Sequence, residues 1–348
     1  MGTEKNTGKK GVLQVKKYRK KKLSVEELTQ GVFNGDKSVL ARAITIVEST
    51  RNEDLKKAYT LVENCLSKKS NSIRIGITGV PGVGKSTFIE VFGTTLTSLG
   101  KKVAVLAVDP TSTFSKGSIL GDKTRMQELV KDPNAFIRPS PSGESLGGVA
   151  RKTRESVILC EAAGYDIVLI ETVGVGQSET AVHSMVDFFL LLKLAGAGDE
   201  LQGIKRGIME MADAIVINKA EGDNLKKAER AKVEFERALQ LYPPKESGWI
   251  PQVSTCSAID NTGITEIWEM IGQFLKTTKD NGFLEVNRQN QNKYWLLQTV
   301  NELLKQHFFQ TSAVKEHLET MLQQVAKDKI SPFRAAEVLM AGYRKELK

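Results

Sequence analysis

The sequence is poor in the residues that build disulfide frameworks and metal clusters. Its 348 residues include three cysteines and three histidines, and Cys65, Cys160 and Cys256 lie far apart without a C-x-x-C pair. Neither a disulfide framework nor a structural zinc site is expected from this spacing. Such cysteine use favours a reducing compartment, either the cytoplasm or, in a eukaryote, the mitochondrial matrix. No apolar run reaches the roughly 18 residues of a membrane-spanning helix, so we expect no membrane insertion.

The net charge of +9 belongs almost entirely to one end of the chain. Residues 1–22 contain nine lysines and arginines against one glutamate, so the rest of the chain is nearly neutral. A charge run of this kind is typical of a disordered, solvated tail, which we assign to residues 1–23. Because the body of the chain is nearly neutral, we do not expect a nucleic-acid partner.

The pattern of apolar residues divides the remaining chain into three parts. Residues 24–70 have helical spacing and begin with a capping box, Ser24 with Glu27. In residues 71–280, short β-branched runs alternate with helix-length segments, which predicts an α/β domain with a mostly parallel sheet. The expected strands are 73–78, 103–108, 135–138, 166–170, 188–192, 214–217 and 250–254. Residues 281–348 return to helical spacing and are expected to cap the sheet or to form a dimerisation arm.

A complete P-loop motif, G-x-x-x-x-G-K-S, occupies Gly79 to Ser86. It follows an expected strand and opens an expected helix, which is the context that this motif requires. Its backbone N–H groups and the helix N-terminus are suited to phosphate oxygens. We expect Lys85 to reach the β- and γ-phosphates and the Ser86 hydroxyl to bind Mg²⁺. The residues predicted to bind the phosphates are Gly79, Gly82, Val83, Gly84, Lys85, Ser86 and Thr87.

Three carboxylates are placed to support that magnesium ion. Asp109 and Glu171 end two expected strands, and Asp122 lies between them in the sequence. The carboxyl ends of parallel strands meet at one edge of a sheet, and Mg²⁺ prefers oxygen ligands, so these side chains are candidate ligands. Gly174, in the motif Glu171-Thr-Val-Gly, is placed to present its N–H to the γ-phosphate.

A candidate base-reading motif follows the strand expected at 214–217. Asn218-Lys219-Ala-Glu221 is similar to the N-K-x-D guanine reader of G proteins, with Glu in place of Asp. The extra methylene displaces the carboxylate by about 1.5 Å, so the preference between guanine and adenine stays open. Ser257 and Ala258, after the last expected strand, are expected to offer backbone N–H groups to the base.

Taken together, these motifs resemble one family, the methylmalonyl-CoA mutase-associated GTPases of the MeaB/MMAA/ArgK type, within the SIMIBI class of P-loop GTPases. The resemblance runs from about residue 24 to 340. The segments that carry it are 108–113, 117–126, 145–148, 171–179 and Gly196–Ile208. Glu221 departs from the Asp of the family, 114–116 varies a switch segment, and the basic residues before 24 fall outside the resemblance.

The resemblance implies a GTP-hydrolysing chaperone of an adenosylcobalamin-dependent acyl-CoA mutase, which gates cobalamin loading and protects or reactivates the mutase. It implies Asp109, Asp122 and Glu171 around Mg²⁺, with Ser86 as a direct ligand. It also implies a switch at Gly196–Ile208 that brings Lys205 to the nucleotide, together with a homodimer formed through the C-terminal helices. Which acyl-CoA mutase is the partner, the basal rate of hydrolysis and the role of the basic tail stay open.

Two other functions share this fold. A nickel- or zinc-insertion GTPase usually carries Cys or His clusters, which this sequence lacks. A P-loop kinase or ATPase linked to amino-acid transport is the second alternative. The motif Glu171-Thr-Val-Gly174 favours a γ-phosphate-sensing G protein over a phosphotransferase.

Overall fold

The computed structural model describes residues 23–108, 126–139, 146–172, 178–196 and 206–347. Its centre is a seven-stranded sheet in the order β3-β2-β4-β1-β5-β6-β7, and every strand pair is parallel. The strands are β1 Ile73–Gly79, β2 Val103–Val108, β3 Ala135–Arg138, β4 Ile167–Thr172, β5 Phe188–Leu194, β6 Ala214–Asn218 and β7 Gln252–Thr255. The predicted α/β fold with a parallel sheet is therefore confirmed.

Strands β2 and β3 have the predicted bounds, and the other five strands differ from the prediction by one or two residues at one or both ends. Strand β4 continues to Thr172, so Glu171 lies inside the strand rather than after it. Strand β7 begins at Gln252 rather than at 250, and the Ile250 side chain is 81% exposed. Pro251 explains the later start of β7, because proline has no N–H to donate to a neighbouring strand.

Helices cover both faces of the sheet, because successive strand side chains point to opposite faces. On one face, α4 (Lys85–Ser98) and α10 (Ile264–Asp280) bury residues such as Ile75, Ile77 and Leu190. On the other face, α6 (Leu146–Ala162) and α7 (Ser178–His183) lie over the β2–β4–β1 half of the sheet. On the same face, α8 (Arg206–Met211) and α9 (Leu225–Leu239) cover β6 and β7. Two single turns, η1 (Leu129–Lys131) and η2 (Gly222–Asn224), complete these connections.

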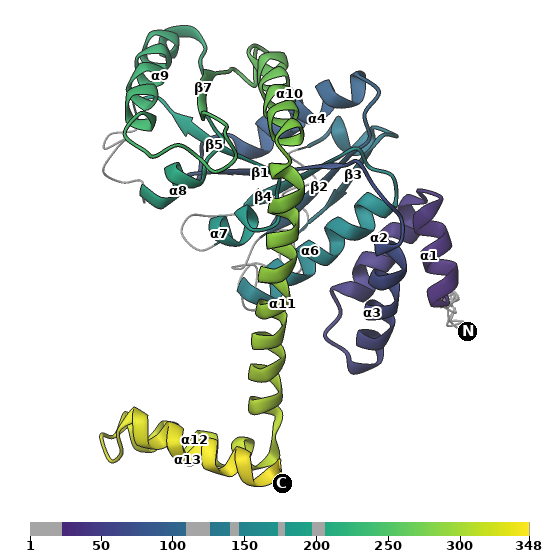
Figure 1. Cartoon of the computed structure of the whole chain (residues 1–348), viewed down its shortest axis with the longest axis vertical. Helices are drawn as coiled ribbons and strands as arrows, with labels where there is room; N and C mark the ends of the chain where they lie inside the picture. Colours follow the sequence, from purple (N-terminus) through teal and green to yellow (C-terminus); the bar gives the residue numbers. More distant parts are fainter. Residues whose placement is uncertain (1–22, 109–125, 140–145, 173–177, 197–205, 348) are drawn as a thin grey trace, which may run out of the picture.

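The N-terminal helices form a third layer outside α6 (Figure 1). They are α1 (Val25–Phe33), α2 (Lys37–Val47) and α3 (Asn52–Leu66). The predicted capping box is present: the Glu27 N–H donates to Ser24 Oγ at 3.1 Å, and the Ser24 N–H donates to Glu27 Oε2 at 2.8 Å. Leu40 and Ile44 of α2 are fully buried in one hydrophobic cluster with residues of α6 and of the sheet, so the layer belongs to the main core.

The C-terminal part of the chain extends away from the sheet as an arm. Figure 1 shows α11 (Phe283–Gln310) running away from the domain, with the pair α12 (Ser312–Ala326) and α13 (Pro332–Glu346) across its far end. Pro332 occupies the first turn of α13, where its missing N–H leaves no helical hydrogen bond unmade. Only Gln291 and Trp295 are buried along α11. No helix in the described ranges has both the length and the apolar character needed to span a bilayer.

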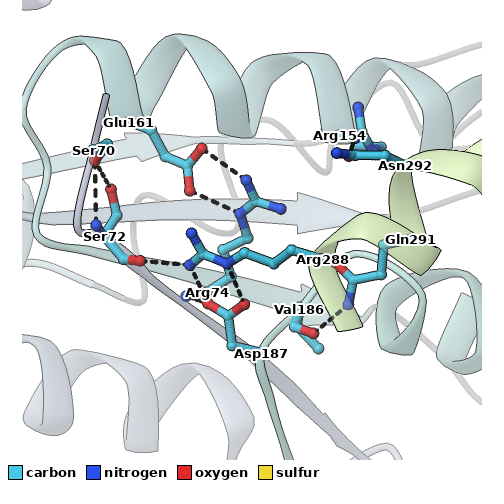
Figure 2. A network of polar contacts seen from close by, with 10 residues as sticks. All are labelled: Ser70, Ser72, Arg74, Arg154, Glu161, Val186, Asp187, Arg288, Gln291 and Asn292. Atoms are coloured by element: carbon cyan, nitrogen blue, oxygen red, sulfur yellow. Dashed lines mark hydrogen bonds and ion pairs between the residues drawn. The ribbon is translucent and has the colours of Figure 1, made fainter. Parts of the chain in front are cut away.

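A buried ionic network fastens the root of α11 to the sheet (Figure 2). Arg288 donates to both carboxylate oxygens of Asp187, at 2.8 and 2.6 Å, and to the Ser72 carbonyl at 2.7 Å. The Arg74 N–H also donates to Asp187, at 2.9 Å, while the Arg74 guanidinium makes a bidentate pair with Glu161. The network therefore joins α11 to α6 and to the amino ends of β1 and β5.

Two further hydrogen bonds continue this attachment along α11. Gln291 donates to the Val186 carbonyl at 2.7 Å, and the Trp295 indole N–H donates to the Ser184 carbonyl at 3.0 Å. Beyond Trp295, the side chains of Leu296, Leu297 and Leu304 are largely exposed. The arm is thus anchored over its first turns, and its remaining length carries exposed apolar groups.

Candidate nucleotide-binding site

The P-loop joins the carboxyl end of β1 to the first turn of α4. Gly84 is the N-cap of α4 and has a φ of 92°, in the left-handed region that favours glycine. A Cβ at Gly84 would lie 2.9 Å from Asn218 Nδ2, so both the backbone angle and the close approach require glycine. The backbone N–H groups at the start of α4 form an anion-binding end of the kind used for phosphates.

Lys85 is buried within this loop. Its ammonium donates to the Gly79 carbonyl at 2.8 Å, and its side chain is 9% exposed. Burial lowers the pKa of Lys85, while the negative charges of Glu171 and Glu179 act in the opposite direction. The cation is therefore held at the mouth of the loop, next to two buried carboxylates.

Ser86 and Glu171 lie together beside the loop. Ser86 Oγ donates to Glu171 Oε1 at 3.3 Å. The pairing of Ile77 with Glu171 across β1 and β4 places this carboxylate there, and a bond from Thr172 Oγ1 to Thr78 Oγ1, at 2.9 Å, joins the same two strands. The sequence predicted that both residues would lie at this edge of the sheet.

A hydroxyl and a carboxylate are oxygen donors that suit Mg²⁺, which usually takes one or two carboxylates together with phosphate oxygens and waters. Within the described residues, no group of three or more His, Cys, Asp or Glu side chains is arranged to hold a metal by itself. The local chemistry therefore fits a magnesium ion shared with a nucleotide better than a protein-only metal centre.

Four of the expected site residues, Asp109, Asp122, Gly174 and Lys205, lie outside the described residues. Val108, which directly precedes Asp109, pairs with Thr172 across β2 and β4. The end of β2 therefore lies beside the end of β4, where Glu171 is found.

The candidate base-reading motif, residues 218–221, contacts the P-loop directly. Asn218 Nδ2 donates to the Val83 carbonyl at 2.9 Å, and Lys219 Nζ donates to the Gly82 carbonyl at 3.0 Å. Asn218 also accepts a hydrogen bond from the Cys256 thiol at 3.4 Å. Burial raises the pKa of Cys256 to about 12, aided by the charge of Glu221, so the thiol keeps its proton at neutral pH. The motif and the P-loop thus form one connected unit.

Glu221 and the loop after β7 complete this corner. Glu221 Oε2 is buried and has no hydrogen-bond partner among the described residues. The Ser257 N–H donates to the Thr262 carbonyl at 3.0 Å, whereas the Ala258 N–H makes no hydrogen bond within the described chain. The backbone N–H groups of both residues were predicted to be available to the base. Of the two, only the Ala258 N–H is free of a hydrogen bond within the described chain.

A further buried acid lies near the P-loop lysine, and no sequence motif indicated it. Glu179, at the start of α7, is 2% exposed and acts electrostatically on Lys85. The motif at 171–179 ends with this residue, but neither its spacing nor its type gave it a role. A buried acid close to the P-loop lysine can be recognised only once the fold is known.

Comparison with known proteins identifies the family. The model of the family described as methylmalonyl-CoA mutase-associated GTPase MeaB matches residues 40–313. A mouse protein named methylmalonic aciduria type A homolog, mitochondrial, is 46% identical over 330 residues, covering 92% of this chain and 80% of its own. The GTPase ArgK of Escherichia coli is 46% identical over 309 residues, covering 89% of this chain and 93% of its own.

A solved structure, described as that of a LAO/AO transport system kinase, is 38% identical to this chain and superposes with a TM-score of 0.72. The match covers 92% of this chain and 97% of that protein. Fold, P-loop and sequence similarity therefore agree, and the chain belongs to the MeaB family of methylmalonyl-CoA mutase-associated GTPases and is itself a P-loop GTPase.

Proposed function

We propose that this GTPase is a chaperone of an adenosylcobalamin-dependent acyl-CoA mutase of the methylmalonyl-CoA mutase type. In this role, GTP binding and hydrolysis gate the loading of the cobalamin cofactor and protect or reactivate the mutase. The observation that carries the proposal is the family match over residues 40–313, because the description of that family names the mutase. We place the protein in the cytoplasm or, in a eukaryote, in the mitochondrial matrix.

The P-loop residues hold the phosphates in this proposal. Backbone N–H groups from Gly79 to Thr87 surround the phosphate oxygens, and the Lys85 ammonium moves from the Gly79 carbonyl to the β- and γ-phosphates. The 2.8 Å hydrogen bond from Lys85 Nζ to the Gly79 carbonyl supports this role. It holds the ammonium at the loop through a neutral acceptor. A phosphate oxygen would replace a neutral acceptor with a charged one, and charge-assisted hydrogen bonds are the stronger kind.

Ser86 and Glu171 would hold Mg²⁺ together with Asp109 and Asp122. When bound, the ion neutralises negative charge on the phosphates and supports in-line attack by water. The hydrogen bond between Ser86 Oγ and Glu171 Oε1 supports this assignment, since the two oxygens already lie 3.3 Å apart.

Hydrolysis requires two groups that we assign from the family resemblance. Gly174 would present its backbone N–H to the γ-phosphate, and Lys205 would stabilise the negative charge that develops on it. A cation that arrives from a loop can act in this way, as arginine fingers do. This arrangement makes turnover dependent on whatever positions the segment that carries Lys205.

Guanine would be read by Glu221 and Ala258. A carboxylate can accept from both the N1–H and the N2–H₂ of guanine, and adenine offers no such pair of donors. The buried, unpaired Glu221 Oε2 supports this role, because a buried acceptor without a partner is costly until a ligand supplies a donor. The free Ala258 N–H is suited to the base oxygen, while Asn218 and Lys219 hold the motif against the P-loop.

The C-terminal arm would form a homodimer. Leu296, Leu297, Leu304 and Phe333 expose between 57% and 87% of their surface on α11 and α13, which supports an apolar contact between two copies. Sedimentation of the purified protein should give twice the chain mass. Polar substitutions at Leu296 and Leu297 should shift it to the monomer while GTP turnover remains.

The test of the main proposal is turnover of GTP and of ATP, with and without the adenosylcobalamin-dependent mutase from the same source. We expect slow GTP hydrolysis that the mutase accelerates, and no hydrolysis of ATP. Lys205→Ala should abolish the acceleration and leave nucleotide affinity unchanged. Turnover that does not respond to any mutase would overturn the chaperone role, and transfer of labelled γ-phosphate to an acceptor other than water would favour a kinase.

A further inference from the structure

A pocket of about 360 Å³ lies between the domain and the outer part of the C-terminal arm. Its walls come from α6, from the turn between α2 and α3 with the start of α3, and from the part of α11 beyond Trp295. Figure 1 shows α11 passing across α6, and the two helices are in contact. Of the described residues that line the pocket, none belongs to the P-loop or to the motif at 218–221. The nucleotide site therefore does not account for it.

The walls of this pocket are positively charged. Arg151 and Lys152 of α6 and Lys305 of α11 line it, together with the acid Glu302. Lys152 is buried and donates to the Glu48 carbonyl, which fixes its charge in the wall. Three cations against one carboxylate leave two positive charges in the described lining, and like charges on facing walls repel each other. An anion between the walls would remove this repulsion.

Arg151 lacks a partner within the part of the chain that the structure describes. Its Nε is buried without a hydrogen bond, and its guanidinium forms no ion pair there. One turn further along α6, Arg154 donates to Asn292 Oδ1 and so joins α6 to α11 directly (Figure 2). At Arg151 the corresponding acceptor is missing among the described residues. A buried donor of this kind is costly until a ligand supplies an acceptor.

The rest of the lining indicates a ligand that combines an anion with an apolar group. Leu55, Leu303 and Phe309 line the same pocket, and small-molecule sites usually place a few polar groups among apolar walls. A phosphate monoester has three acceptor oxygens and a charge of about −1.5 to −2 at pH 7, which matches the two uncompensated positive charges. A carboxylate carries one charge on two oxygens and would neutralise only half of them.

We propose that this pocket binds a phosphate monoester that carries a small apolar group. The phosphate contacts Arg151 from α6 and Lys305 from α11, and the apolar group lies against Leu303 and Phe309. The Lys305 side chain is 70% exposed, so its ammonium has room to turn toward the phosphate. The bound ligand joins the domain to the part of α11 beyond Trp295.

The pocket and the proposed dimer contact lie on different sides of α11. Glu302, Gln306 and Phe309 recur at steps of four and three residues, so they share the side of the helix that lines the pocket. Leu297 and Leu304 are seven residues apart and, at about 100° per residue, fall on the side roughly opposite Glu302. Ligand binding therefore depends neither on the proposed homodimer nor on the mutase.

The first experiment measures binding to the full-length protein by calorimetry. The protein is saturated with Mg²⁺ and a non-hydrolysable GTP analogue, so that the phosphate positions of the P-loop are filled. Phenyl phosphate, which joins one phosphate to one ring, should bind to this complex. Benzoate has the same ring with a carboxylate and should bind at least about tenfold more weakly, the loss of one charged contact. Absence of phenyl phosphate binding, or equal affinity for benzoate, would overturn the proposal.

Variants of the two walls test which residues hold the phosphate. Arg151→Gln should weaken phenyl phosphate by about tenfold or more, and Lys305→Gln, at a more exposed position, by about two- to fivefold. The matched controls Arg230→Gln on α9 and Lys315→Gln on α12 remove an exposed arginine and an exposed lysine away from the pocket, and should leave affinity unchanged. Equal weakening in all four variants would show unspecific attraction and overturn the site, as would unchanged affinity in the two pocket variants.

Hydrogen exchange of the same complex locates the ligand. Phenyl phosphate should slow amide exchange in residues 146–154 and 296–310 and leave α9 unchanged. In the described structure the last hydrogen bond from α11 to the domain is that of Trp295, so protection beyond this residue reports the new bridge. Protection confined to residues 79–87 would place the phosphate at the nucleotide site and would overturn the proposal.

Discussion

Replacing Glu221 by alanine is expected to remove discrimination between GTP and inosine triphosphate, because these two nucleotides differ only in the 2-amino group of the base. In the wild-type protein that group donates to the Glu221 carboxylate in our proposal. Hydrogen bonds to charged groups contribute about 1.5–3 kcal/mol, so one such bond corresponds to a preference of about 10- to 150-fold for GTP. The Glu221→Ala variant should bind both nucleotides with nearly equal affinity.

The structure indicates that the loss of this hydrogen bond affects nucleotide affinity and not folding stability. Glu221 Oε2 is buried without a partner among the described residues, so its removal breaks no hydrogen bond of that oxygen within the described protein. The loss should therefore be seen in nucleotide affinity and not in folding stability. Competition against a fluorescent guanine nucleotide gives both dissociation constants, and thermal unfolding checks the stability of the variant.

Two controls make the result interpretable. Asp223→Ala removes an exposed carboxylate two residues away and should leave the ratio of GTP to inosine triphosphate affinity unchanged. Glu221→Asp restores a shorter carboxylate and should keep a clear preference for GTP. If the alanine variant retains the wild-type ratio, the carboxylate does not read the base and the assignment of Glu221 is wrong.

The remaining predictions concern the metal, the network and one histidine. Ser86→Ala should raise the Mg²⁺ concentration needed for half-maximal GTP turnover by about tenfold or more, and chelation should stop turnover in both proteins; an unchanged requirement would exclude Ser86 as a ligand. Asp187→Asn leaves the partly buried Arg288, whose side chain is 25% exposed, without its charged partner, which should cost about 1.5–3 kcal/mol and lower the melting temperature by about 2–4 °C. A double-mutant cycle with Arg288→Met should reveal coupling above about 1 kcal/mol, and additive effects would refute it. Burial lowers the pKa of His183, with Asp213 opposing and Lys245 assisting, so this residue should cost stability as the pH falls below about 6.5, the unfolded value. His183→Phe should flatten that decline in urea titrations between pH 7.5 and 5.5, and an equally steep decline would contradict the shift.

The sequence was sufficient for the parts of the site that depend on local order. The P-loop follows from its own spacing, and Glu171 could be placed beside Ser86 because the ends of parallel strands share one edge of a sheet. The three-helix N-terminal layer could also be predicted, since its capping box and helical periodicity are local signals.

The parts that could not be predicted depend on contacts between distant segments. Ser257 and Ala258 differ because the Ser257 N–H donates to the Thr262 carbonyl, and the residue types give no sign of that pairing. Asp187 and Arg288 are 101 residues apart in sequence, so their ion pair had no sequence signal. The buried Glu179 belongs to the same class, because only the packing of α7 brings its charge near Lys85.

The attachment of α11 makes the arm a lever whose fulcrum lies at Trp295, where the anchored turns of the helix end. From Trp295, the last anchored side chain, to Gln310 the helix extends about 22 Å at 1.5 Å per residue. A tilt of about 10° at this fulcrum would displace the far end by about 4 Å over such a length. Because Asp187 receives hydrogen bonds from both β1 and α11, the strand that leads into the P-loop and the base of the lever share one carboxylate. A small rearrangement around the Asp187 carboxylate would therefore produce a larger displacement of α12 and α13 at the far end of the arm.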